Sequence, residues 1–175
     1  MKKSIAFLSL LMLTLIWAPR ASAQYEPGQM DFNLGIGLVP TFGAGNGGLP
    51  ISISGDYGIK ENIGIGGYLG YARSSETLPF FGKTTYSYFI LGLRGTYHYP
   101  ILDGLDTYGG ALLGYNVASV SIENTFPGWP EPKAASGLSY SFFLGARYHF
   151  NDQFGAFGEL GYGISILNLG LTLKL

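Results

Sequence analysis

The sequence has no cysteine, and charged residues make up only 12% of it. Without cysteine the chain can form neither disulfides nor thiolate metal sites, and it cannot be anchored as a lipoprotein. A typical soluble domain carries charges on about 25% of its residues. The chain is therefore poor in charge for its length, and the placement of its apolar residues decides its class.

The first residues have the pattern of a secretory signal peptide. Lys2 and Lys3 give a positive start, residues 5–17 form an apolar run, and residues 21–23 read Ala-Ser-Ala, a small-residue cleavage site. The apolar run is shorter than the roughly 20 residues of a transmembrane helix. We expect cleavage before Gln24, which divides the chain into a signal peptide over 1–23 and one domain over 24–175.

The expected mature chain lacks both an excess of basic residues and a long apolar run. Loss of Lys2, Lys3 and Arg20 with the signal leaves 7 basic against 11 acidic residues, a net charge of −4. This balance gives no basic surface for nucleic acid. No later stretch is long and apolar enough to cross a membrane as a helix. The apolar residues must therefore follow a pattern along the chain.

Alternation of apolar and polar residues is that pattern. In 167–175 every second residue is leucine, and the positions between hold asparagine, glycine, threonine and lysine. A period of two places the leucines on one face of a β-strand, whereas a helix would scatter them. The same test predicts eight strands, over 32–39, 51–59, 63–72, 84–99, 108–121, 138–150, 154–164 and 167–175. Ile90 breaks the alternation of its strand.

The connections between these strands alternate in length. Short ones lie at 59–62, 100–106 and 151–153, and longer ones at 40–50, 74–83 and 122–136. Short turns at one end and long loops at the other are typical of outer-membrane barrels. The sequence therefore predicts an all-β fold, an eight-stranded antiparallel up-and-down transmembrane β-barrel in the outer membrane. The even number of strands places both ends of the mature chain on the periplasmic side.

The cost of charge in lipid decides which face of each strand points outward. An arginine at the bilayer midplane costs about 2–4 kcal/mol, and the charged residues share the parity of the narrow, glycine-rich face. A soluble barrel of the lipocalin kind needs the reverse arrangement, and this broad apolar face would be an aggregation liability in water. We therefore place a polar network in the lumen, made of Asp56, Arg94, His98, Arg147, His149, Glu159 and Lys174. This network is either a gated polar path or a plug of paired side chains, and the narrow lumen of eight strands favours the plug.

Aromatic residues near the short turns predict an interfacial girdle on the outer wall. Its expected members are Tyr57, Tyr97, Tyr99, Tyr108, Tyr148, Phe150 and Phe154. On the same parity argument, the outward face of 154–164 includes Tyr162 and Ile164.

The segments 144–152 and 154–175 carry a family resemblance. Together they resemble the outer-membrane protein β-barrel domain family, the small opacity-protein-like barrels of Gram-negative bacteria. The resemblance implies an eight-stranded up-and-down barrel inserted by the outer-membrane assembly machinery. That machinery commonly reads a C-terminal strand that ends in an aromatic residue, whereas this chain ends in Leu175. The family is defined by its fold and implies no shared catalytic residues.

The leading functional hypothesis is a structural or surface-interaction barrel. The loop 122–136 is stiffened by prolines and carries Phe126 and Trp129, which could contact a partner or pack over the barrel mouth. The expected partners are outer-membrane lipids (lipopolysaccharide and phospholipid), the assembly machinery and an extracellular ligand bound through the loops. We expect a monomer without a cofactor.

Two other functions are weighed against this one. A narrow pore for small solutes or ions is the alternative. A lipid-modifying enzyme is less favoured, because His98 and His149 face the lumen with no serine beside them on the outer wall. Two histidines without a third ligand also make a poor metal site. We therefore expect a protein that is not an enzyme.

Overall fold

The computed structural model describes residues 25–42, 46–78, 82–99, 101, 104–123 and 133–175. The expected signal peptide lies outside these residues, and so do Phe126 and Trp129. The strands are β1 (Met30–Gly37), β2 (Asn46–Gly47), β3 (Ile51–Lys60), β4 (Ile63–Leu78), β5 (Gly82–His98), β6 (Leu105–Ile122), β7 (Gly137–His149), β8 (Phe154–Gly161) and β9 (Leu167–Lys174). Within the described ranges no helix is long and apolar enough to cross a membrane.

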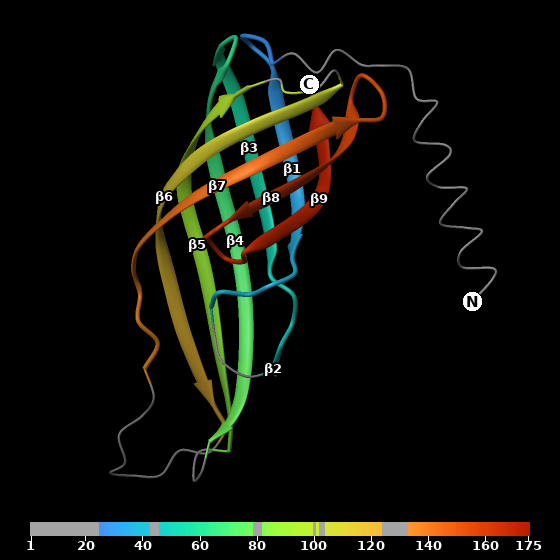
Figure 1. Cartoon of the computed structure of the whole chain (residues 1–175). Coiled ribbons are helices and arrows are strands. Elements are labelled where there is room, and N and C mark those ends of the chain that lie inside the picture. Colours follow the sequence, from blue (N-terminus) through green and yellow to red (C-terminus); the bar gives the residue numbers. More distant parts are fainter. Residues whose placement is uncertain (1–24, 43–45, 79–81, 100, 102–103, 124–132) are drawn as a thin grey trace, which may run out of the picture.

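The strands close into a barrel (Figure 1). Apart from β2, each strand pairs antiparallel with the next long strand along the chain, and β1 also pairs with β9, which joins the two ends of the sheet. The two-residue β2 adds to the edge of β4 at Ser74 and Ser75. The predicted eight-stranded antiparallel up-and-down barrel is confirmed.

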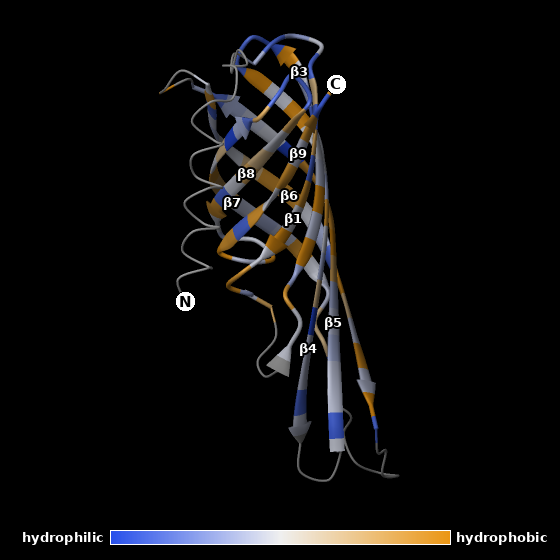
Figure 2. Ribbon diagram, turned by 90° about the vertical axis from the view of Figure 1, so that its right-hand side faces the viewer, coloured by the Kyte–Doolittle hydropathy of each residue, from blue (hydrophilic) through white to orange (hydrophobic). Residues whose placement is uncertain are grey.

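Side chains alternate between the lumen and the outer wall. Along β1 and β3 every second residue is buried and most of the residues between are exposed. Buried positions carry polar residues such as Asp31, whereas Leu93 and Leu144 on the wall are 76% and 71% exposed. Figure 2 shows apolar segments recurring along the strands of the barrel body. An apolar outer wall around a polar lumen is the arrangement of a barrel whose wall faces lipid.

The two ends of the barrel differ. At one end, here called the turn end, β3 and β4 join through Glu61 and Asn62, and β7 and β8 join through residues 150–153. The C-terminus lies at the same end (Figure 1). At the other end, here called the loop end, β4, β5 and β6 run well past the remaining strands (Figure 1).

The structure corrects the prediction of a long loop over 74–83. β4 and β5 stay paired from Arg73↔Ser87 to Leu78↔Gly82, so most of this stretch is strand. The outward residues there are polar, as shown by the pale and blue lower parts of β4 and β5 in Figure 2. Apolar alternation marks only the part of a strand that faces lipid. Residues 74–78 of β4 and 82–83 of β5 extend beyond the lipid.

Ile90, which breaks the alternation of its strand, faces the lumen, where it is buried. Two further predictions about single side chains are wrong. Tyr108 is not part of the girdle, because its position on β6 shares the lumen parity of Leu112. Ile164 is buried rather than outward, because β8 ends at Gly161 and the chain then bends inward.

Glycines on the lumen face make room for the large side chains of neighbouring strands. A Cβ atom at Gly145 would overlap the ring of Tyr108 on β6. A Cβ atom at Gly110 would overlap the ring of Phe143 on β7. The lumen is therefore packed by aromatic rings that sit beside glycines.

Candidate functional site

The most distinctive site is a buried network of charges that crosses the lumen, and Arg94 on β5 is one of its two centres. Arg94 Nη2 lies 2.7 Å from Glu159 Oε1 on β8, and its Nε lies 3.0 Å from Asp56 Oδ1 on β3. Its Nη1 also donates to Ser54 Oγ at 3.1 Å. One guanidinium thus connects three strands that are far apart in the sequence.

Arg147 on β7 is the second centre and has no exposed surface. Its Nη1 lies 3.1 Å from Asp31 Oδ2 and 3.5 Å from Asp106 Oδ2, and its Nη2 pairs with Asp56. Asp56 therefore lies between the two arginines and binds both. A fully buried arginine needs such carboxylate partners, because an unpaired buried charge is strongly destabilising.

The two histidines lie closer to the turn end. His98 Nδ1 is 2.7 Å from Asp106 Oδ1, and its Nε2 is 3.0 Å from Thr96 Oγ1. His149 Nε2 is 4.0 Å from Asp31 Oδ1. Each histidine thus stands beside a carboxylate that also binds Arg147.

The segment before β1 seals the turn end of the lumen. The Tyr25 ring stacks on His98 with centroids 3.6 Å apart, and both side chains are buried. Gly28 N donates to Gly58 O at 2.8 Å, which holds the segment against β3. Tyr25 lies outside the strands, and burial, then the charge of Asp56, raises the pKa of its hydroxyl. The phenol therefore stays neutral beside the carboxylates.

The aromatic rings of Tyr108 and Phe143 pack against the two arginines of the network. Tyr108 donates its hydroxyl to Glu159 Oε1 at 2.8 Å. The guanidinium of Arg147 lies 4.3 Å from the centroid of the Tyr108 ring, and that of Arg94 lies 4.3 Å from the Phe143 ring. Such cation–π contacts help to satisfy desolvated arginines.

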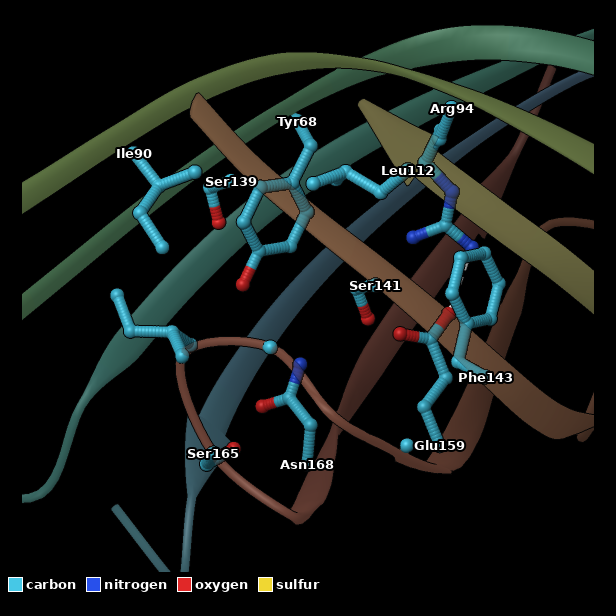
Figure 3. Close-up of a pocket in the computed structure, with 13 residues that line it drawn as sticks. Tyr68, Ile90, Arg94, Leu112, Ser139, Ser141, Phe143, Glu159, Ser165 and Asn168 are labelled. Carbon is cyan, nitrogen blue, oxygen red and sulfur yellow. Dashed lines mark hydrogen bonds and ion pairs between the residues drawn. The ribbon is translucent and has the colours of Figure 1, made fainter. Parts of the chain in front are cut away.

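Toward the loop end the lumen holds apolar and uncharged polar side chains. A buried apolar cluster extends from Tyr108, which lies among the charges, toward the loop end; its members are Ala72, Ile90, Tyr108, Leu112, Phe143 and Ile164, and Phe42, Tyr68 and Tyr88 pack against it. Ser141, Ser165 and Asn168 are buried beside this cluster. Between the cluster and the Arg94–Glu159 pair lies a cavity of about 40 Å³ (Figure 3). This space suits a few water molecules rather than a solute path.

The structure places six of the seven predicted network residues in the lumen: Asp56, Arg94, His98, Arg147, His149 and Glu159 are all buried. Lys174 is half-buried at the end of β9, and no carboxylate among the described residues forms an ion pair with it. The predicted loop contacts Phe126 and Trp129 lie outside the described residues.

Sequence reasoning missed Asp31, Asp106, Tyr108 and Tyr25. The predicted strands begin at 32 and 108, so Asp31 precedes the first of them and Asp106 falls in the predicted connection 100–106. Their parity is the available signal, because Asp31 and Asp106 lie on the lumen faces of β1 and β6 near the turn end. Tyr25 precedes the first predicted strand, so the alternation of apolar and polar residues does not predict where its side chain lies.

The chemistry of this arrangement is structural. The three donor nitrogens of Arg94 face a carboxylate or a hydroxyl, and Arg147 binds carboxylates through Nη1 and Nη2, whereas its Nε has no hydrogen-bond partner among the described residues. Both arginines are closed off from the loop end by the apolar cluster. Within the described part of the chain, no group of three or more histidine, aspartate or glutamate side chains is placed to hold a metal ion.

A closed barrel with a charged, packed lumen and an apolar outer wall defines an integral membrane β-barrel. The model of the outer membrane protein beta-barrel domain family matches residues 8–172, and the chain belongs to this family. The family and the similar structures indicate the outer membrane of Gram-negative bacteria. No curated protein sequence matches the chain at a significant level.

Solved structures show the same fold. OprG of Pseudomonas aeruginosa is similar with a TM-score of 0.64 at 11% identity, over 89% of this chain and 99% of OprG. A de novo designed transmembrane β-barrel is similar with a TM-score of 0.56 at 16% identity, over 87% and 99%. Neisserial surface protein A is similar with a TM-score of 0.50 at 16% identity, over 84% and 94%. At these identities the likeness concerns the fold alone.

Proposed function

We propose that this protein is a non-conducting outer-membrane barrel that contacts partners at the cell surface through its loop end. The observation that carries this proposal is an arm of three paired strands, formed by residues 73–78 of β4, 82–87 of β5 and 118–122 of β6. The arm projects beyond the barrel body (Figure 1).

The arm begins where the apolar wall ends. The last outward apolar residues are Tyr71 on β4, Phe89 on β5 and Val117 on β6, and all three are exposed. Beyond them the positions of the same parity on the three strands are polar: Arg73, Ser75, Thr77, Lys83, Thr85, Ser87, Ser119 and Ser121. Of these, Arg73, Thr77, Lys83, Ser119 and Ser121 are exposed, whereas Thr85 is buried and bonds to Ser75. At about 3.3 Å per residue, six residues of strand reach about 20 Å beyond the lipid band.

The orientation follows from the connections. Outer-membrane barrels keep short turns on the periplasmic side and long loops outside. The turn end, with both ends of the described chain, accordingly belongs to the periplasmic side. The arm and the connection 123–136 then face the exterior, where Phe126 and Trp129 stay candidate contacts.

The packed lumen argues against a pore, the alternative function. An eight-stranded barrel is only just wide enough for side chains to fill it. Here the turn half is filled by the ion pairs of Arg94 and Arg147, and the loop half by the apolar cluster. A conducting state would have to break buried ion pairs, and that is costly.

Lipid chemistry is also disfavoured. A lipid-modifying barrel needs a nucleophile and a base on its wall at the lipid surface. His98 and His149 are both buried inside the lumen and directed to Asp106 and Asp31. This placement of the two histidines supports the proposal that the protein is not an enzyme.

Shortening the arm tests the proposed function. Removal of residues 75–78 and 82–85 deletes four pairs from the β4–β5 ladder, and the equal lengths keep the register of the remaining pairs. Cells that display the wild-type chain should bind to immobilised extracellular matrix proteins or to a layer of the same cells above the level of the empty host. The shortened variant should fall to that level.

A matched control and a contrary result make the test specific. The double variant Phe126→Ala and Trp129→Ala changes the neighbouring connection and leaves the arm intact. Binding that survives shortening of the arm but is lost in the double variant would move the contact to residues 123–136. Binding that survives both changes would contradict a role for the loop end.

A further inference from the structure

We propose that the outward face of the arm binds the phosphorylated saccharide headgroup of lipopolysaccharide in the surrounding membrane, with Arg73 and Lys83 as the ligands of its phosphates. This inference goes beyond contact with partners at the cell surface, because the ligand is a lipid of the membrane that holds the barrel. It rests on the orientation proposed above, in which the arm faces the exterior.

The base of the arm lies at the edge of the apolar wall. The last outward apolar row consists of the cross-strand neighbours Tyr71, Phe89 and Val117. The next outward row consists of Arg73, Ser87 and Ser119. Two residues of strand rise about 7 Å. The first polar row of the arm therefore lies at the level where the acyl chains of the outer leaflet end and the headgroups begin.

Arg73 and Lys83 are the cations of this face, and both are exposed. Among the described residues, neither side chain forms an ion pair. The arginines of the lumen differ, because Arg94 and Arg147 are buried against carboxylates. The two cations of the arm thus remain available to an anion outside the protein.

The carboxylates of the arm leave Arg73 without a competing negative charge on its own face. Glu76 lies on the other face of β4, where it bonds to the hydroxyl of Tyr86. Glu123 follows the end of β6 at the tip and accepts the backbone N–H of Lys83 at 3.1 Å. A carboxylate therefore stands close to Lys83, and Arg73 is the stronger of the two phosphate ligands.

The order of side chains along β4 matches the order of groups in the lipid. From the wall outward the strand presents Tyr71, Arg73, Ser75 and Thr77. Aromatic residues of barrel walls lie at the membrane interface. A guanidinium binds a phosphate through two parallel hydrogen bonds, and hydroxyls both donate to and accept from sugar hydroxyls. An acyl chain, a phosphate and a saccharide meet their complements in the same sequence.

The spacing of the two cations favours lipopolysaccharide over a phospholipid. Lys83 pairs with Thr77, which is four residues beyond Arg73 on β4. The two levels are therefore about 13 Å apart along the strands. A phospholipid carries its phosphate next to the acyl chains, at the level of Arg73 alone. Lipopolysaccharide carries phosphates on several sugars at increasing distance from the membrane, and this suits both levels.

The test measures binding of purified lipopolysaccharide to the folded barrel in detergent, with a dye attached at Asp152→Cys in the distant turn. The double variant Arg73→Gln and Lys83→Gln should weaken binding about tenfold, since two exposed charge contacts are lost. The matched control, Lys60→Gln with Lys133→Gln, removes the same charge at exposed positions outside the arm. It should bind within about twofold of the wild type.

Two further ligands test the chemistry of the headgroup on the wild-type chain, so they hold even if a variant does not fold. Dephosphorylated lipopolysaccharide should bind about tenfold more weakly than the native lipid, because both cations lose their phosphates. Phosphatidylglycerol should also bind more weakly, because it offers no phosphate at the level of Lys83.

Three results would overturn the proposed lipid site. The first is equal binding of lipopolysaccharide by the double variant and its control. The second is equal binding of native and dephosphorylated lipopolysaccharide by the wild type. The third is phosphatidylglycerol that binds as tightly as lipopolysaccharide, which would reduce the site to a general attraction for anionic lipid.

Whole-cell binding separates this site from the proposed surface role. The double variant keeps an arm of full length, so cells that display it should still bind as the wild type does. If the lipid site fails its tests but shortening the arm abolishes whole-cell binding, the surface role stands without the lipid site. If lipopolysaccharide binding depends on Arg73 and Lys83 but shortening the arm leaves whole-cell binding unchanged, the lipid site stands and the surface role fails.

Discussion

Arg94 Nη2 lies 2.7 Å from Glu159 Oε1, and this buried pair ties β5 to β8 across the lumen. The two residues are 65 positions apart in the sequence. Glu159 also accepts the hydroxyl of Tyr108, so one carboxylate serves two strands besides its own. The interior of this barrel is thus held by polar contacts, while its apolar surface faces out.

Glu159→Ala should destabilise the barrel. The change leaves Arg94 with Asp56 and Ser54 but without its nearest carboxylate, and it leaves the Tyr108 hydroxyl without an acceptor. Breaking a buried pair costs about 3–5 kcal/mol, and the remaining partners should hold the loss near the lower value. Thermal unfolding in detergent measures this loss of stability. Asp152→Ala in an exposed turn is the control, and equal melting temperatures for both variants would refute a structural network.

Arg147→Ala should cost more than Arg147→Lys. Arg147 is fully buried and has three carboxylate neighbours, so its removal leaves several uncompensated negative charges. Lysine restores the positive charge but not the planar fork of donors, so Arg147→Lys should recover only part of the lost stability. The same unfolding measurement ranks the two variants. A lysine variant no more stable than the alanine variant would show that charge is not what Arg147 supplies.

Gly145→Ala should destabilise the barrel, whereas Gly67→Ala should not. A Cβ atom at Gly145 would overlap the Tyr108 ring, whereas nothing lies within 4 Å of one at Gly67 on the outer wall. Overpacking of this kind costs about 1–3 kcal/mol, while the surface change should stay within about 0.5 kcal/mol. Urea unfolding of the lipid-embedded protein compares the free energies of unfolding of the two variants. A Gly145→Ala variant as stable as the wild type would mean that the lumen is not tightly packed.

The barrel itself could be predicted from the sequence because lipid imposes a strict rule. Each strand that crosses the bilayer must place apolar residues outward at every second position, and that rule fixes the parity of Asp56, Arg94, Arg147 and Glu159 as well. No such rule acts beyond the lipid. The outward positions over residues 74–78 of β4 and at Lys83 of β5 are polar, so these parts of the strands carry no signal of apolar alternation.

The contents of the lumen were harder to predict. A side chain inside the barrel is selected by its neighbours across the lumen, and these come from strands distant in the sequence. Tyr108 therefore resembled a girdle tyrosine in sequence, although its hydroxyl binds Glu159 on β8. Tyr25 stacks on His98 through a contact that local sequence does not encode.

The packed lumen predicts an absence of conductance. The purified protein, reconstituted in planar bilayers, should show no stable current steps, because ion pairs and the apolar cluster fill both halves of the lumen. A large porin in the same bilayers serves as the positive control. Regular steps from the wild-type chain would restore the pore as its function.

Whole-cell labelling tests most directly the claim that the arm faces the exterior. The chain contains no cysteine, so one introduced residue gives a clean signal. Thr77→Cys places a thiol on the exposed outer face of the arm, and Asp152→Cys places one in the exposed turn between β7 and β8. A membrane-impermeant maleimide should label intact cells at Thr77→Cys and leave Asp152→Cys unlabelled until the outer membrane is permeabilised. Labelling of Asp152→Cys but not Thr77→Cys in intact cells would contradict the orientation and the surface role built on it.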